Sequence, residues 1–188
     1  VNKVLKKGIL SDFIATSGKG FNGGKHVKKF EEKLKKFYKV KHAITVNSWT
    51  SGLICAVGSL DIEPGDEIIT TPRTFIATSS SAVLQGLTPV FADIDFDSGL
   101  ITPKTIEPLI NKNTLGISVV HLAGVPADMI NIQKLANNYN LKIIEDCSQS
   151  HGAKILNNGK WISVGSFGDL ATWSFCQDKI ISTGGEGG

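Results

Sequence analysis

Short apolar runs alternate with helical patterns along this chain of 188 residues, and that alternation constrains the fold more than any other feature. The apolar runs have the length of buried strands, and the stretches between them leave room for crossover connections. Such a pattern favours a mostly parallel sheet with helices on both faces. The sequence therefore predicts an α/β protein with three layers, αβα, in one domain over residues 1–188. Expected strands cover residues 42–46, 67–70, 89–94, 115–120, 141–146 and 170–175, and expected helices cover residues 25–38, 53–57, 75–84 and 129–139, with another opening at Thr102-Pro103.

Composition narrows the class of protein. The net charge of +3 is too small to indicate a nucleic acid or an anionic membrane as partner, and no segment approaches the roughly 20 apolar residues of a membrane span. Cys55, Cys147 and Cys176 lie far apart without metal-ligand spacing, so we expect reduced thiols, no metal site and a cytoplasmic protein. Residues 1–20 lack the apolar core of a signal peptide. Because the sequence stops at Gly188, directly after its most site-like loop, we expect a piece of a longer protein.

One candidate site follows the apolar run at residues 170–175. Ser174 ends that run, Lys179 comes five residues later, and a glycine-rich stretch follows up to Gly188. A lysine just beyond a core strand can act as a nucleophile when it is partly desolvated, and glycines allow a flat ligand to come close. For a single lysine, the competing interpretation is a surface residue in a flexible loop.

A second stretch favours the site. The run at residues 141–146 ends on Glu145 and Asp146. If both runs are parallel strands, Asp146 and Lys179 lie at the same carboxyl edge of the sheet, where open α/β sheets bind ligands. A carboxylate and an amine at that edge match the needs of pyridoxal phosphate (PLP), whose aldehyde binds a lysine and whose ring nitrogen pairs with an acid.

Three further features stay open on residue patterns alone. The segment Asn47–Gly52 lies between an expected strand and a helix, which suits a phosphate site, but plain helix capping by Asn47 or Ser48 explains it equally well. Phe75 follows Thr74, the expected helix cap, and could either lie against a flat ring or belong to the core. Gly18–Gly23 fits the dinucleotide pattern G-x-G-x-x-G, but Ser11–Ser17 is a poor strand, so a mobile loop is the better interpretation.

Several of these stretches together resemble one family. The motifs run from residues 20–30 through 64–69 and 89–94 to the block at residues 121–129, and the most specific ones cover residues 145–153 and 174–188. In order and spacing they resemble the DegT/DnrJ/EryC1/StrS aminotransferases, which are PLP-dependent. The resemblance covers nearly the whole chain and implies the large domain of a fold type I PLP-dependent transferase. The family's second half, a small C-terminal domain that helps to build the sugar pocket, lies outside this sequence.

The resemblance also implies a role for each matching residue. Lys179 would form the internal aldimine and then move the proton between substrate and cofactor, while Asp146 would pair with the pyridine nitrogen. Gln149 would hydrogen-bond the ring's phenolic oxygen. The remaining cofactor contacts would come from Thr50, Ser51 and Ser174 at the phosphate and from Phe75 on the ring face. The sequence departs from the family at Trp49-Thr50-Ser51-Gly52, where a small residue, threonine and alanine are usual, so we expect a bulkier phosphate cradle.

The function implied by the resemblance is transfer of an amino group, with glutamate as donor, to a nucleotide-linked keto-sugar for a surface polysaccharide such as lipopolysaccharide. Family members are homodimers with shared active sites. A dehydratase of the same family would carry histidine at the position of Lys179, and a cyclitol aminotransferase is a third option. A non-catalytic regulatory relative would have no physical need for Lys179, Asp146 and Gln149. A nicotinamide oxidoreductase rests on the glycine pattern alone.

Overall fold

The computed structural model describes residues 2–10, 13–18 and 20–188. The chain divides into two compact units, residues 1–45 and residues 46–188. The prediction of one PLP-binding domain over residues 1–188 stays a prediction. Among the described helices, none combines the length and apolar character that crossing a membrane requires.

The first unit contains two helices, α1 (Asn2–Lys7) and α2 (Lys25–Tyr38). The bounds of α2 are those that its apolar spacing predicts. The carboxylate of Glu31, on this helix, accepts two hydrogen bonds of 2.9 Å, from the backbone N–H and the hydroxyl of Thr45. These bonds hold the last residue of this unit against the helix. Residues 13–18 form no strand, so the glycine pattern at Gly18–Gly23 lacks the strand that a dinucleotide site needs. Ser11, Asp12 and Lys19 lie outside the described residues.

The second unit is built on a five-stranded sheet in the order β2-β1-β3-β4-β7, and every neighbouring pair is parallel. This confirms the predicted parallel sheet. The two strands that carry the candidate site, β4 and β7, are direct neighbours, with Asp146 opposite Thr172. The strands are β1 (Glu67–Thr70), β2 (Thr88–Phe91), β3 (Thr114–Val120), β4 (Lys142–Asp146) and β7 (Leu170–Thr172).

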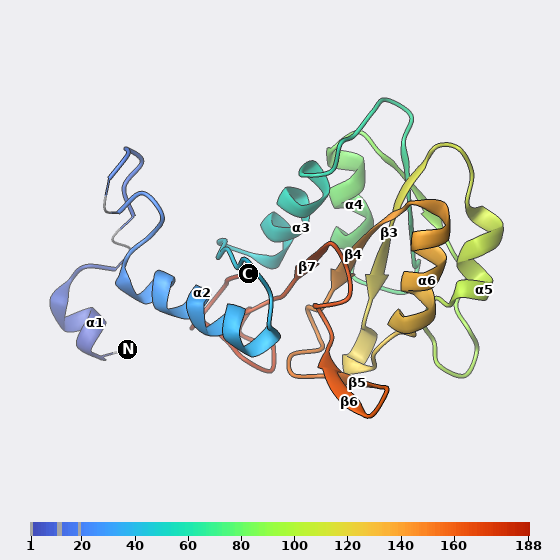
Figure 1. Cartoon of the computed structure of the whole chain (residues 1–188). Coiled ribbons are helices and arrows are strands. Elements are labelled where there is room, and N and C mark those ends of the chain that lie inside the picture. Colours follow the sequence, from blue (N-terminus) through green and yellow to red (C-terminus); the bar gives the residue numbers. More distant parts are fainter. Residues whose placement is uncertain (1, 11–12, 19) are drawn as a thin grey trace. The chain divides into compact units, whose positions relative to one another are not determined.

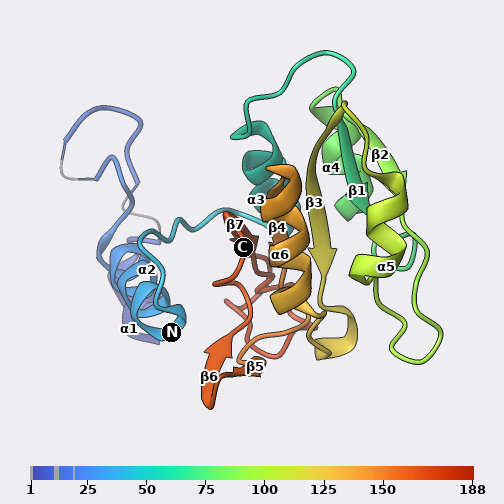
Figure 2. The same cartoon turned by 45° about the vertical axis from the view of Figure 1, so that its right-hand side comes forward.

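Helices cover both faces of this sheet (Figures 1 and 2). One face packs against α3 (Trp49–Gly58) and α4 (Ala77–Leu84), and the other against α5 (Pro103–Ile106), the 3-10 turn Glu107–Leu109 and α6 (Met129–Tyr139). Successive strand residues point to opposite faces, so two clusters of buried side chains form.

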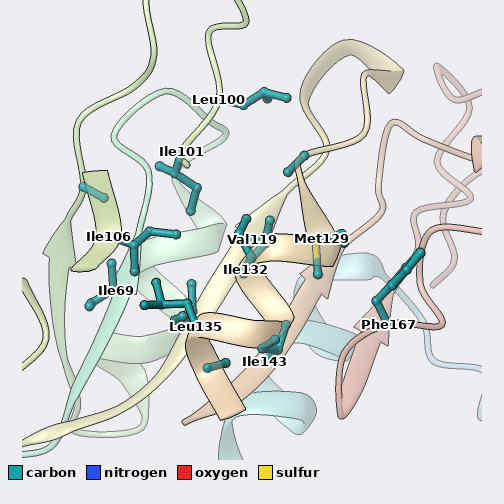
Figure 3. Packing of buried hydrophobic residues seen from close by; sticks show 14 residues of the cluster. Ile69, Leu100, Ile101, Ile106, Val119, Met129, Ile132, Leu135, Ile143 and Phe167 are labelled. Carbon is teal, nitrogen blue, oxygen red and sulfur yellow. The ribbon is translucent and has the colours of Figure 1, made fainter. Parts of the chain in front are cut away.

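The pair Ile143 and Ile144 shows this division. Ile143 belongs to the core under α6, together with Val119 and Ile132, as Figure 3 shows, whereas Ile144 belongs to the core under α3. Both faces of the sheet are therefore apolar, as expected for parallel strands that are buried on both sides.

Four predicted elements differ from the structure. The strand expected at residues 89–94 is β2, which ends at Phe91. Residues 42–46 form no strand, because within the described part of the chain Val46 is the only one of them that exchanges backbone hydrogen bonds, of 2.9 and 3.0 Å, and its partner is Gly188. The last strand ends at Thr172 rather than Phe175, since its neighbour β4 ends opposite, at Asp146. Helix α4 begins at Ala77 rather than Phe75, and Thr74 does not cap it.

A hairpin of β5 (Lys154–Asn157) and β6 (Lys160–Ser163) was not predicted, although the sequence carries its signal. Asn158 and Gly159 join the strands with φ values of 50° and 76°. An Asn-Gly pair between two short runs that contain apolar residues, here Ile155-Leu156 and Trp161-Ile162, is a strong local indication of such a turn. Its inner side chains, Ile155 and Ile162, pack against the core under α6.

The close approach of β3 and β4 provides a test of this packing. A Cβ added to Gly116 would lie 2.6 Å from the backbone oxygen of Lys142, so we expect Gly116→Ala to lower the free energy of unfolding by about 1–3 kcal/mol. Ser118→Ala is the matched control on the same strand. The Ser118 hydroxyl is buried without a hydrogen-bond partner among the described residues, so its removal should cost nothing. Chemical denaturation measures both; equal losses would contradict the packing argument.

Candidate functional site

The carboxyl ends of β3, β4 and β7 lie in register at one edge of the sheet. Val120, Asp146 and Thr172 are directly paired across the three strands. The backbone of the next residues continues this alignment: the N–H of His121 donates to the Asp146 carbonyl (3.1 Å), and the N–H of Cys147 donates to the Thr172 carbonyl (2.8 Å). Three loops therefore start side by side, which is the arrangement that open parallel sheets use to bind ligands.

Asp146 is the buried acid at this edge, with 1% of its surface exposed. One carboxylate oxygen accepts from the hydroxyl of Thr78 on α4 (3.0 Å) and the other from the backbone N–H of Ser148 (3.1 Å). Burial raises the pKa of Asp146, and the bonds from Ser148 and Thr78 oppose this shift. A carboxylate can accept about four hydrogen bonds, so Asp146 has capacity for a further donor, and a cationic one would stabilise its charged form.

The neighbouring acid, Glu145, is fully buried and has a different environment. Its oxygens accept from the backbone N–H groups of Gly165 (2.8 Å), Phe167 (2.7 Å) and Gly168 (2.7 Å), and from Nε2 of His121 (3.0 Å). Four donors satisfy the carboxylate within the protein. Glu145 therefore holds the loop at residues 165–168 against β4 and has no capacity left for a ligand.

His121, Glu145 and Cys147 lie close enough to suggest a metal site, since their ligand atoms are within 4.8 Å of one another. The donors and acceptors of His121 and Glu145 are already used, however: Nδ1 of His121 accepts from the N–H of Ala127 (3.1 Å), and Nε2 faces Glu145. Burial, followed by the charges of Glu145 and Asp146, raises the pKa of the Cys147 thiol well above its usual range, which keeps it protonated. We interpret the cluster as a hydrogen-bonded network.

Gln149 lies three residues beyond Asp146, in the loop that follows β4. Its Oε1 accepts a 2.7 Å hydrogen bond from the backbone N–H of Ala123. Ala123 belongs to a 3-10 turn at Leu122–Gly124, in the loop that follows β3. This bond joins the loops after β3 and β4.

The start of α3 carries the predicted phosphate residues Thr50 and Ser51. Ser48 caps the helix: its hydroxyl accepts from the N–H of Ser51 (3.2 Å) and lies 3.1 Å from the Ser51 hydroxyl. The capping interpretation is therefore correct, and it is compatible with an anion at the same helix end, because the first-turn N–H groups have no acceptor within the helix. A Cβ on Gly188 would lie 2.6 Å from the backbone of Ser48, so only glycine fits beside this cap.

Trp49 places its bulk in the protein core. Its side chain is 8% exposed, packs among the residues under α3, and donates from Nε1 to the Thr172 hydroxyl at the end of β7 (3.2 Å). The Phe75 ring lies 6.0 Å from the Trp49 ring, at an angle of 58°, and is 62% exposed. Phe75 is therefore an accessible aromatic ring beside the start of α3 and is not part of the core.

The loop after β7 carries Ser174 and Lys179. Ser174 is buried, and its hydroxyl accepts from the N–H of Cys176 at 3.4 Å. Lys179 keeps 24% of its side chain exposed and donates from Nζ to Asp178 (3.0 Å). Within the described residues, no hydrogen bond or ion pair joins Lys179 to Asp146. The loop is closed by the backbone of Phe175, whose N–H donates to the Gly187 carbonyl (2.8 Å).

His151 and Thr78 are site residues that sequence reasoning missed. Within the described residues neither nitrogen of the buried His151 ring has a partner in good geometry, and the ring lies 5.4 Å from that of Phe175. Burial lowers the pKa of His151; the nearby Ser174 backbone raises it, and the charge of Lys179 lowers it further. Thr78, which binds Asp146, lies 68 residues away in sequence, so no local pattern could indicate it.

Comparisons with known proteins agree with this geometry. Residues 10–188 match the sequence profile of the DegT/DnrJ/EryC1/StrS aminotransferase family, so the chain belongs to that family, whose aminotransferases are PLP-dependent. GDP-perosamine synthase from Vibrio cholerae is 39% identical over 165 residues, which cover 88% of this chain and 44% of the relative. The chain therefore spans less than half the length of this relative.

Two solved structures show the same fold. An aminotransferase from Psychrobacter cryohalolentis superimposes with a TM-score of 0.88 at 44% identity, covering 99% of this chain and 44% of that protein. NtdA from Bacillus subtilis, solved with the bound cofactor PMP, superimposes with a TM-score of 0.82 at 30% identity, covering 99% of this chain and 38% of that protein. The fold of these residues is that of the PLP-dependent aminotransferases.

The bond between Thr78 and Asp146 leads to a prediction about charge. Thr78→Val removes the donor that stabilises the carboxylate, so the pKa of Asp146, already raised by burial, should rise further. Thr78→Ser keeps the hydroxyl and should leave that pKa unchanged. Carbon-13 NMR titration of the Asp146 carboxyl group in the full-length, cofactor-free protein measures the shift. An Asp146 that titrates at or below its ordinary range would contradict the buried environment.

Proposed function

We propose that this chain forms the cofactor-binding half of a PLP-dependent aminotransferase. One observation carries the proposal. A buried carboxylate, Asp146, ends a strand whose parallel neighbour leads into the loop of Lys179. A buried carboxylate is costly without a cationic partner, and among the described residues no lysine or arginine bonds to Asp146. A protonated pyridine nitrogen is the kind of donor that this carboxylate favours.

Each residue has a role in this proposal. Asp146 keeps the ring nitrogen protonated, Gln149 donates to the phenolic oxygen, and Phe75 covers one ring face. Thr50 and Ser51 bind the phosphate at the start of α3, where backbone N–H groups and the helix dipole favour an anion, and Ser174 adds a further contact.

Lys179 is the catalytic residue. Its amine would hold the cofactor and, once released by the donor's amine, would take and return the proton at the substrate carbon. The bound cofactor supplies an electron sink for the charge that develops when the C–H bond breaks.

The proposed substrates are glutamate as amino donor and a nucleotide-linked keto-sugar as acceptor, which gives an amino-sugar for a surface polysaccharide such as lipopolysaccharide. The name of the V. cholerae relative, GDP-perosamine synthase, supports a nucleotide-linked sugar. A lysine rather than histidine at position 179 favours amino transfer over dehydration. A homodimer with shared sites is part of the proposal. The proposed location is the cytoplasm. All three cysteines are free, and the cytoplasm is a compartment that keeps thiols reduced.

The visible spectrum of the full-length protein with PLP tests this proposal. The wild type should show a Schiff-base band that glutamate removes, whereas Lys179→Ala should lack the band. Lys142→Ala is the matched control, because that lysine begins β4 and pairs with Asp169 at the surface, at 3.6 Å. It should behave like the wild type.

Each other result would point elsewhere. A folded wild type without the band would overturn the role of Lys179. A band that glutamate leaves unchanged would contradict the donor and favour another amine, and a band that no amine removes would favour a regulatory protein.

A further inference from the structure

Two hydrogen bonds fix His121 at the end of β3. Its Nδ1 accepts from the backbone N–H of Ala127 (3.1 Å), so the proton must be on Nε2, which donates to Glu145 (3.0 Å). His121 is fully buried, and Glu145 is itself held by three backbone N–H groups of the loop at residues 165–168. The imidazole therefore anchors both ends of the segment 121–127 to a fixed carboxylate.

The segment between these anchors has a constrained backbone. Ala123 has φ 54° and ψ 23°, and Gly124 has φ 80°. A left-handed conformation at a residue with a Cβ carries strain and persists only where the surroundings impose it. This conformation directs the Ala123 N–H toward the side chain of Gln149. The two loops are closely packed here, since a Cβ on Gly124 would lie 3.2 Å from the backbone oxygen of Gln149.

This N–H decides which way the Gln149 amide faces. A backbone N–H can only donate, so the atom 2.7 Å from it must be the amide oxygen. The amide nitrogen, with its two N–H donors, is then turned away from the segment 121–127. An amide that could rotate would present either its oxygen or its nitrogen to a ligand, and only the nitrogen can donate to a phenolic oxygen.

We propose that His121, held by Glu145, is a positioning residue for the cofactor: it fixes the segment 121–127 so that the Ala123 N–H holds the Gln149 amide with its nitrogen toward the phenolic oxygen of PLP. The cofactor part of this inference rests on the function proposed above. The hydrogen-bonded device itself lies within this chain and can be tested without cofactor.

The first test is amide hydrogen exchange by NMR on the full-length protein without PLP. Ala123 is exposed to solvent, so its N–H owes its protection to Gln149. We expect exchange at Ala123 to become about tenfold faster in Gln149→Ala, which removes the acceptor, and faster also in His121→Asn, which cannot reach Glu145. Ile132→Val, a packing change on the neighbouring helix α6, should leave this amide unchanged. Equal rates in wild type and Gln149→Ala would overturn the device, whether or not PLP binds.

The second test is the pH titration of the visible band with PLP bound. A hydrogen bond donated to the phenolic oxygen stabilises its negative charge, so the oxygen holds the neighbouring imine proton less tightly. Gln149→Ala removes this donor and should therefore raise the titration midpoint by about one pH unit. His121→Asn should shift the midpoint in the same direction. When Gln149→Ala is already present, His121→Asn should cause no further shift of the midpoint, because His121 acts on the cofactor through the Gln149 amide.

These outcomes separate positioning from simple destabilisation. A midpoint that stays unchanged in His121→Asn while thermal stability falls, or that shifts equally in both backgrounds, would overturn the proposal. If His121→Asn does not fold, His121→Gln serves instead: it keeps a donor for Glu145, loses the acceptor for Ala127, and should give a smaller shift in the same direction. Absence of any visible band in folded wild type would reject the proposed function, and the exchange rates would still decide on the device.

Discussion

The parallel pairing of β3, β4 and β7 is the constraint on which the candidate site depends. It sets Val120, Asp146 and Thr172 opposite one another, so the loops that carry Gln149, Ser174 and Lys179 begin at one edge. Because apolar cores cover both faces of the sheet, this edge is where polar groups of the strands can meet a ligand. The burial that holds the strands together also removes Asp146 from water and makes its charge depend on a cationic partner.

Glu145 and Asp146, the two adjacent acids at the end of β4, have different roles. Glu145 is satisfied by four donors, which fix the loop at residues 165–168 and the ring of His121. Among the described residues, Asp146 accepts from Thr78 and Ser148 and has no cationic partner, so it retains capacity for a ligand. Strand residues that follow one another point to opposite faces, so the first acid serves the scaffold while the second serves the site.

Local patterns predicted much of the architecture. Alternating apolar runs and helical spacing indicated the parallel sheet, and α2 has the predicted bounds. Long-range partners decided the rest. Residues 42–46 have strand composition, but among the described residues only Val46 pairs with another backbone segment, and Thr78 bonds to Asp146 across 68 residues. The hairpin at Asn158-Gly159 had a readable signal and was missed. The pair of acids at a strand end indicated Asp146 as a site residue. The role of Glu145 could not be predicted in the same way, because its four donors come from segments 20 to 24 residues away.

The proposed function requires that Lys179 binds the cofactor whose ring nitrogen pairs with Asp146. Borohydride reduction of the full-length protein with PLP would fix any imine permanently, and peptide mass spectrometry would then locate the pyridoxyl group. We expect the added mass on Lys179, at one group per chain, and its loss from that peptide in Lys179→Ala. A pyridoxyl group found on another lysine of the wild type, with Lys179 unmodified, would contradict it.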